Sequence, residues 1–139
     1  MTSPRTIEVL VVEDDDDIRA ALEDILKDQG YELATAANGA DALAHIDGSG
    51  MPKLIVLDLM MPVMDGWTFH RELLRRPHGD QVPVVILSGF PLPSGAETTA
   101  GIRHYVAKPI KLDTLLGLVA GELARLENQS ARPLAARSV

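Results

Sequence analysis

The sequence predicts an α/β domain built on a doubly wound parallel sheet of five strands, with helices on both faces. Three observations support this fold class. Five short apolar runs alternate with stretches of helical spacing, which is the pattern of βαβ units. The third run is apolar throughout, as is typical of a strand buried on both faces. The chain has 139 residues, enough for one domain with one core.

The first half of the chain is expected to form three strands and two helices. A stripe of apolar residues at helical spacing begins at Ile18, and Gly30 fits the C′ position that ends this helix. A second helix follows the turn at Asn38-Gly39 and is short. The expected strands are residues 7–12, 31–36 and 54–58, and the expected helices are residues 18–29 and 40–46.

The third strand runs directly into Asp58. An ionised carboxylate is costly to bury without partners, so we expect Asp58 at the carboxyl end of the strand and outside the sheet. Pro62 lacks an amide proton, and the strand must stop before it. The pair Asp65-Gly66 then predicts a structural turn into the next helix.

The second half continues the alternation less regularly. Residues 88–108 are rich in Pro and Gly, so any helix there must be short, and residues 96–100 are the best candidate. Asp113 is a suitable N-cap for the last helix. We expect one domain over residues 5–127 and a flexible tail over residues 128–139. The expected strands are residues 82–87 and 103–107, and the expected helices are residues 67–74, 96–100 and 114–126.

Composition and charge exclude several classes of function. The net charge is −7, which argues against a nucleic-acid surface and suits a protein that binds a cation or a basic partner. The chain has no Cys, which excludes disulfides, thiolate metal sites and a Cys nucleophile. No apolar run is long enough to span a membrane, and the N-terminus lacks the apolar core of a signal peptide. A soluble, cytoplasmic protein is therefore expected.

Polar side chains follow four of the predicted strands. In the flavodoxin-like strand order 2-1-3-4-5, a crevice opens at the carboxyl ends of the first and third strands. Those ends carry Glu13, Asp14 and Asp58, while Ser88 and Lys108 follow the fourth and fifth strands. Two carboxylates about 4 Å apart repel by about 4 kcal/mol at an effective dielectric near 20, so a cation is expected between them. Oxygen ligands without His or Cys favour Mg²⁺, which commonly accompanies phosphoryl chemistry, and a carboxylate can itself accept a phosphoryl group.

The motifs that carry these side chains resemble those of the response-regulator receiver domain of two-component signalling. The resemblance covers about residues 7–126, nearly the whole chain, and the combination of motifs is specific. The matching motifs are VVEDD (residues 11–15), LIVLDLMMPVMDG (residues 54–66), ILSG (residues 86–89) and YVAKP (residues 105–109).

The resemblance implies a role for each residue of the predicted site. Asp58 is the expected phosphoacceptor, and Lys108 is expected to contact the phosphoryl group. Asp14 resembles the direct Mg²⁺ ligand, and Glu13 resembles the acid that acts through water. Asp58 and the main-chain carbonyl of Met60 complete the expected set of protein ligands.

Three further features follow from the resemblance. Ser88 and Tyr105 resemble the switch pair, in which the hydroxyl moves towards the phosphate and the aromatic ring turns inward. The Lys108–Pro109 bond is expected to be cis. The segment between Ser88 and Lys108 is shorter than is usual in the family. We therefore expect a short or irregular fourth helix, and we do not expect the usual dimer built on the fourth helix, fifth strand and fifth helix. Met60 and Phe90 are apolar and could hinder an attacking water, so we expect slow self-dephosphorylation.

The expected function is a signalling switch, and two alternatives remain. The switch accepts a phosphoryl group from a histidine kinase or phosphotransfer protein and signals by protein–protein contact to a target that the sequence does not identify. We expect either a stand-alone receiver or one cut from a longer regulator, and either a monomer or a weak dimer. We expect no nucleic-acid partner, no membrane partner and no enzymatic activity. The first alternative is a Mg²⁺-dependent aspartyl-phosphate phosphatase, disfavoured because such enzymes typically place an acid where Met60 stands. The second is a flavodoxin-like cofactor binder, disfavoured because the acids after the first strand would repel a phosphate.

Overall fold

The computed structural model describes residues 7–89 and 101–131 and contains a five-stranded parallel sheet of order β2-β1-β3-β4-β5. This is the predicted strand order. The strands are β1 (Val9–Val12), β2 (Leu33–Ala36), β3 (Leu54–Asp58), β4 (Val84–Ser88) and β5 (Ile102–Ala107). The helices are α1 (Asp16–Asp28), α2 (Gly39–Ser49), α3 (Gly66–Leu74) and α4 (Leu112–Ala131), with a 3₁₀ turn at Gly79–Gln81.

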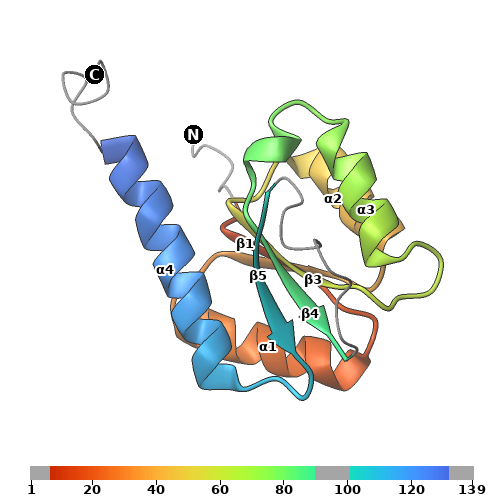
Figure 1. Cartoon of the computed structure of the whole chain (residues 1–139), viewed down its shortest axis with the longest axis horizontal. Helices are drawn as coiled ribbons and strands as arrows, with labels where there is room; N and C mark the ends of the chain where they lie inside the picture. Colours follow the sequence, from red (N-terminus) through yellow and green to blue (C-terminus); the bar gives the residue numbers. More distant parts are fainter. Residues whose placement is uncertain (1–6, 90–100, 132–139) are drawn as a thin grey trace, which may run out of the picture.

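The helices form two layers, one on each face of the sheet (Figure 1). Alternate residues of β1, β3 and β4 point to opposite faces, so each strand contributes to two apolar clusters. On one face, Leu22 of α1 and Leu115 of α4 belong to the same apolar cluster as Val56 of β3. On the other face, Ile46 of α2 and Phe69 of α3 belong to the cluster that contains Ile55 and Leu57. Every residue of β1, β3 and β4 is buried, which explains why these strands are apolar up to the polar residue that ends β3 and β4, Asp58 and Ser88 respectively.

Helix starts follow the capping residues that the sequence offers. Asp15 caps α1 by accepting a hydrogen bond from the Ile18 amide at 2.9 Å. Asn38 and Asp65 cap α2 and α3 in the same way, each at 2.8 Å. Gly30 has φ 91°, as the C′ position after α1 requires. Asp15, in the acidic run after β1, thus caps helix α1, whereas Glu13 and Asp14 lie directly after the end of β1 and do not cap the helix.

Several element boundaries differ from the prediction. β1 and β2 begin two residues later than expected, and the last helix begins at Leu112, so Asp113 lies in its first turn and is not its N-cap. Asp favours both positions because each places a carboxylate near the helix N-terminus, and sequence alone does not separate them. The same helix continues to Ala131, past the expected domain end at residue 127. The expected helix at 96–100 and the tail beyond residue 131 lie outside the described residues.

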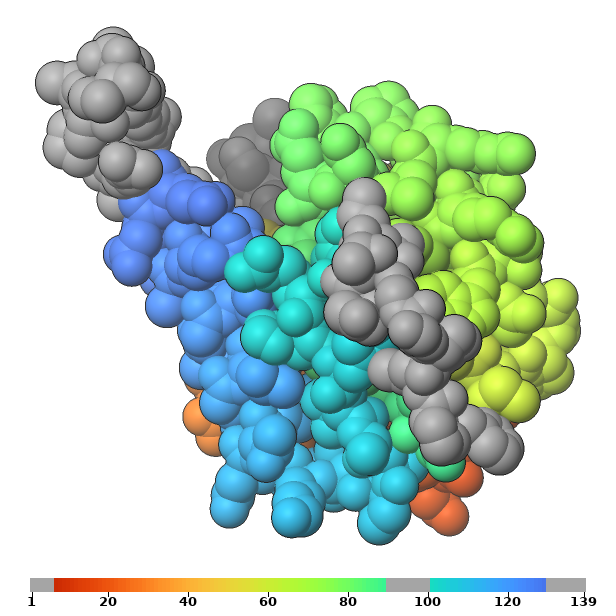
Figure 2. Space-filling view, viewed as in Figure 1, coloured from red at the N-terminus to blue at the C-terminus, as the bar shows by residue number. Residues whose placement is uncertain are grey.

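A buried carboxylate ties the last helix to the edge of the sheet. Glu122 of α4 is only 4% exposed and accepts hydrogen bonds from Arg103 Nε at 3.2 Å and Arg125 Nε at 2.9 Å. His104 Nε2 lies 3.0 Å from the same carboxylate. Burial alone would raise the pKa of Glu122, but hydrogen bonds from Arg125, Arg103 and His104 lower it. Figure 2 shows α4 and β5 side by side on this face of the molecule.

Within the described residues, no helix is both long and apolar enough to cross a bilayer.

Gly66 allows α3 to start close to the end of β3. A Cβ atom at this position would lie 2.7 Å from the carbonyl oxygen of Asp58 and 2.8 Å from Cα of Leu59. The Gly66 amide also donates to the Leu59 carbonyl at 3.0 Å. Glycine therefore keeps the helix start against the backbone that carries Asp58.

We predict that Gly66→Ala destabilises the protein by about 1–3 kcal/mol, because the added methyl group meets backbone atoms that cannot move without displacing β3. Thermal or denaturant unfolding measures the change. Gly117→Ala in α4 is the matched control, since nothing lies within 4 Å of its added Cβ. That variant should gain about 0.5–1 kcal/mol from the better helix propensity of alanine. Equal effects of both variants would contradict the close approach at Gly66.

Candidate functional site

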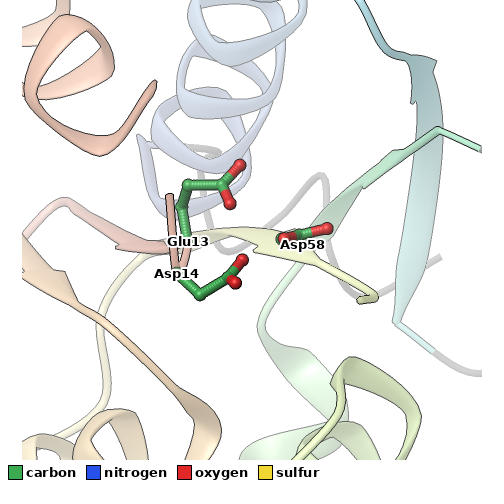
Figure 3. Close-up of side chains that lie close together, drawn as sticks. All are labelled: Glu13, Asp14 and Asp58. Atoms are coloured by element: carbon green, nitrogen blue, oxygen red, sulfur yellow. The ribbon is translucent and has the colours of Figure 1, made fainter. Parts of the chain in front are cut away.

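The acids from two separate parts of the chain meet at the carboxyl edge of the sheet. Glu13 and Asp14 follow β1, and Asp58 is the last residue of β3, the neighbouring strand. One oxygen of each carboxylate lies within 4.8 Å of the others. Figure 3 shows the two side chains after β1 turned towards the end of β3. The predicted convergence of the acids is thus confirmed in the structure.

Asp58 lies where the sequence places it, but it is more enclosed than expected. It is the last residue of β3, pairs with Leu87 of β4, and is 1% exposed. The expectation that it stands outside the sheet was wrong. Oδ1 accepts a hydrogen bond from the Met60 amide at 3.1 Å. Oδ2 is buried and makes no hydrogen bond within the described part of the chain, but it lies 3.4 Å from the Lys108 ammonium group, whose positive charge offsets part of the cost of burial.

Lys108 joins the two buried acids. Its ammonium group lies 2.9 Å from Glu13 Oε1 and 3.4 Å from Asp58 Oδ2, and its side chain is 23% exposed. Burial alone would lower the pKa of Lys108, but the hydrogen bond and charge of Glu13 and the charge of Asp58 raise it. The lysine is therefore firmly protonated and supplies a positive charge between the carboxylates. The cis bond between Lys108 and Pro109 is present, as predicted.

The three acids do not all carry a full negative charge. Burial, together with hydrogen bonds to Glu13 and Asp14, raises the pKa of Asp58 to about 7. Burial would also raise the pKa of Asp14, but hydrogen bonds with Asp58 and Glu13 lower it. Without a cation, Asp58 is therefore about half protonated near neutral pH and mostly protonated below it. The repulsion inferred from sequence is relieved in part by this proton and in part by Lys108.

The loop after Asp58 exposes two apolar side chains next to the acid cluster in the sequence. The Met60 side chain is 59% exposed, and Val63 is 83% exposed. Val63 has φ 69°, and the Met64 amide bonds the Pro62 carbonyl across it at 2.7 Å. A β-branched residue in this conformation carries strain of about 1–3 kcal/mol. Close to Asp58, the loop is thus both strained and unusually apolar at its surface.

Ser88 and Tyr105 lie on neighbouring strands beside this edge. Ser88 is the last residue of β4 and is buried, and its carbonyl accepts from the Lys108 amide at 2.8 Å. Tyr105 of β5 is partly buried and pairs with Ile86, two residues before Ser88. The register therefore places the ring and the hydroxyl on the same face of the sheet, as a linked pair requires.

One contact at the site was not anticipated from the sequence. Arg19 of α1 donates hydrogen bonds from Nη1 to the carbonyl oxygens of Glu13 and Asp14, at 2.9 and 3.4 Å. The only sequence signal is an Arg on the first turn of the helix that follows an acidic strand end. Such a residue is far more often an exposed partner for a helical acid, which explains why the pattern alone did not single it out.

The donor set fits a hard divalent cation. Its side-chain ligands are carboxylates, two of them buried and one partly exposed, without a nitrogen or sulfur donor among the clustered side chains. Mg²⁺ prefers such oxygen ligands and keeps several waters, which suits a cluster with one side open to solvent.

Comparison with known proteins identifies the family. A family model described as the response regulator receiver domain matches residues 9–120. The chain belongs to the response regulator receiver domain family. The receiver domain has the fold of the Vibrio cholerae chemotaxis protein CheY4, with a TM-score of 0.75 and 30% identity, covering 84% of this chain and 98% of that one.

Two further relatives bear on the site and on the length of the chain. One similar solved structure is the receiver domain of the Pseudomonas aeruginosa sensor histidine kinase PA1611, which is described with a magnesium ion coordinated in its active site cleft. The two structures have a TM-score of 0.75 and 28% sequence identity, and the match covers 86% of this chain and 99% of the PA1611 chain. The transcriptional regulatory protein PrrA of Mycobacterium tuberculosis is 41% identical over 127 residues, which are 90% of this chain and 52% of PrrA. The receiver domain thus spans about half the length of the curated relatives it matches.

We predict that Asp58→Asn stabilises the metal-free receiver domain and that the gain grows with pH. The folded-state pKa is raised from 3.8 to about 7, so the folded protein keeps a proton that the unfolded chain has lost. Through Asp58, wild-type stability is therefore highest below about pH 4 and falls until about pH 7, whereas the Asn variant has no such proton to lose. Thermal unfolding in EDTA at about pH 5 and about pH 8 measures the difference, with roughly 4 °C expected for each 1 kcal/mol.

Asp47→Asn is the control for this experiment. Asp47 is an exposed carboxylate whose pKa is lowered by its hydrogen bond with Arg76, so its removal should not stabilise the domain at either pH. A gain for Asp58→Asn that is the same at both pH values would argue against the raised pKa.

Proposed function

We propose that this receiver domain is a phosphorylation-dependent signalling switch and that Asp58 accepts the phosphoryl group. The supporting observation is the position of Asp58 at a solvent-open acid cluster, with one oxygen held by the Met60 amide and the other beside Lys108. A carboxylate fixed in this way is oriented for attack on an electrophilic phosphorus.

The proposed reaction transfers a phosphoryl group from a phosphohistidine. A carboxylate oxygen of Asp58 forms the new O–P bond, the N–P bond of the donor breaks, and its electron pair returns to the imidazole nitrogen. Asp58 must be ionised to attack, and its pKa of about 7 means that only about half of the molecules carry the ionised carboxylate at neutral pH without a cation. Lys108 is expected to leave Glu13 and pair with the transferred phosphoryl oxygens, since its ammonium group already lies beside Asp58.

A magnesium ion is the proposed cofactor, held by the side chains of Asp14 and Asp58, by Glu13 through water, and by the carbonyl of Met60. When bound, such an ion neutralises charge on the transferring phosphoryl oxygens. The oxygen-only donor set and the magnesium ion named for the PA1611 receiver domain support this assignment. The same ion would favour loss of the proton from Asp58, because a nearby positive charge stabilises the carboxylate.

Ser88 and Tyr105 are the proposed switch pair. A phosphoryl group adds about −1.5 to −2 charge at neutral pH, and the Ser88 hydroxyl is expected to move towards it. Tyr105 lies on the same face of the sheet and would turn into the vacated space. The result is a population shift between two packings of the β4–β5 edge, read by a partner protein.

We propose a histidine kinase or a phosphotransfer protein as the donor. The downstream partner depends on what the domain is joined to, because relatives such as PrrA are about twice as long and are named as transcriptional regulators. We propose that this chain itself does not bind nucleic acid, because its net charge of −7 would repel the phosphate backbone. Protein–protein contact remains the proposed output of the domain itself.

The central test uses a small phosphodonor. Wild type incubated with acetyl phosphate and Mg²⁺ should gain the mass of one phosphoryl group, and Asp58→Asn should gain none, with intact-protein mass spectrometry as the measurement. Asp47→Asn should be labelled like wild type. Catalytic turnover of many phosphate esters would indicate the phosphatase alternative, and labelling at another residue would contradict the proposed role of Asp58.

We predict slow self-dephosphorylation and a specific way to accelerate it. Met60 places a largely exposed apolar side chain two residues after Asp58, where it can exclude an attacking water. Replacing it with asparagine supplies groups that can hold such a water, so Met60→Asn should shorten the lifetime of the acyl phosphate several-fold. Loss of the phosphoryl mass with time measures it. A wild-type lifetime of only seconds would contradict the prediction.

A further inference from the structure

Arg19 binds the backbone of the residues that carry the acid pair. Its Nη1 donates to the carbonyl oxygen of Glu13 at 2.9 Å and also reaches that of Asp14 at 3.4 Å. Its Nη2 is paired with the carboxylate of Asp16, and the side chain is only 22% exposed. The guanidinium group thus joins the end of β1 to the first turn of α1.

This contact fixes the segment in which the acid pair lies. The Glu13 amide donates to Ala36 of β2 at 3.0 Å, and the Glu13 side chain accepts from the Asp15 amide at 3.2 Å. Arg19 adds hydrogen bonds to two successive carbonyl groups, so both residues are held through their backbone while their carboxylates face Asp58. Without these bonds, mutual repulsion would favour a loop conformation in which the carboxylates lie farther apart.

The charge of Arg19 and its hydrogen bonds act in opposite directions on cation binding. A positive guanidinium near the acids repels a cation, so its charge alone would weaken binding. Its hydrogen bonds place the ligands, and second-shell groups that orient metal ligands typically contribute about 10–100-fold in affinity. The sign of the effect of a substitution therefore tells which contribution dominates.

We propose that Arg19 is a positioning residue that holds Glu13 and Asp14 in the geometry needed for a divalent cation. Its hydrogen bonds go to the carbonyl groups of Glu13 and Asp14 and to the Asp16 carboxylate, so it acts through the backbone of the acid pair. The inference rests on the proposed function, because it takes the acid cluster to be the cation site. It assigns this arginine to the support of the site and not to the surface of α1.

The experiment compares Mg²⁺ affinity among four variants and wild type, by calorimetry and by the change in Tm between EDTA and saturating Mg²⁺. Arg19→Lys keeps the charge but cannot bridge carbonyl groups and a carboxylate with a planar fork. Arg19→Met removes both the positive charge and the hydrogen bonds to the carbonyl groups. Asp16→Asn removes the exposed ion pair while leaving the carbonyl bonds. Arg75→Met removes the arginine at the C-cap of α3, which makes a comparable i,i+3 pair with Glu72.

The expected result is that both Arg19 variants raise the Kd for Mg²⁺ by about tenfold, whereas Asp16→Asn and Arg75→Met stay within about twofold of wild type. The Mg²⁺-induced change in Tm should shrink for the Arg19 variants only, which a general loss of stability would not produce. Should Arg19→Met fail to fold, Arg19→Lys supplies the same comparison.

Three results would overturn the inference. Tighter Mg²⁺ binding in Arg19→Met with unchanged binding in Arg19→Lys would show that only the charge matters. Unchanged affinity in both variants would show that the carbonyl bonds do not position the acids. Absence of Mg²⁺ binding in wild type would contradict the proposed function itself and, with it, the role of Arg19. This failure is distinguishable from the other two because it appears in the wild-type protein.

Discussion

The repulsion among carboxylates at one edge of the sheet is the constraint on which the rest of the structure depends. Like charges about 4 Å apart at an effective dielectric near 20 cost about 4 kcal/mol, a large share of the stability of a small domain. The Lys108 ammonium group between Glu13 and Asp58 offsets part of this cost, and the proton held on Asp58 offsets another part. Both compensations are reversible, because the ammonium can move and the proton can leave. In the proposed function, these reversible compensations let the site take up a cation and a phosphoryl group without unfolding.

The fold serves this edge by bringing distant parts of the chain together. Parallel strands in the order β2-β1-β3-β4-β5 place the ends of β1 and β3 side by side, although 44 residues of sequence numbering separate Asp14 from Asp58. Two apolar layers hold the strands in register, and Gly66 lets α3 start directly against the end of β3. Polar chemistry at the rim is therefore possible because the strands behind it are entirely buried.

The members of the acid cluster could be predicted from the sequence, because the apolar runs that precede them are short-range patterns, whereas the strand order came from the flavodoxin-like fold class. Apolar runs ending in Glu13, Asp58 and Ser88 show which side chains reach the rim once the order is known. The burial of Asp58 could not be predicted, since it depends on Lys108 and the Met60 amide as partners. The start of the last helix was misplaced by two residues, because Asp113 suits a cap and a first turn equally well.

Contacts of long side chains were the least predictable part. Arg19 reaches two backbone carbonyl groups, and Glu122 collects partners from both β5 and α4, yet nothing in their spacing distinguishes them from ordinary surface charges. Such contacts depend on the relative placement of packed elements, which a periodic pattern does not specify. The proposed roles of Ser88 and Tyr105 rest on the resemblance to the family and stay predictions, although their register is compatible with them.

The irregular pairing of β5 has a consequence for the solubility of the domain. Val84 pairs with Ile102 and Val85 with His104, so Arg103 is an extra residue in the last strand of the sheet. This bulge lets adjacent side chains of β5 turn to the same glutamate on α4. A bulge also increases local twist, and a bent outer strand that carries an arginine is a poor template for a strand from another molecule. The bulge that brings β5 to the last helix therefore also disfavours pairing of this edge of the sheet with a strand from another molecule.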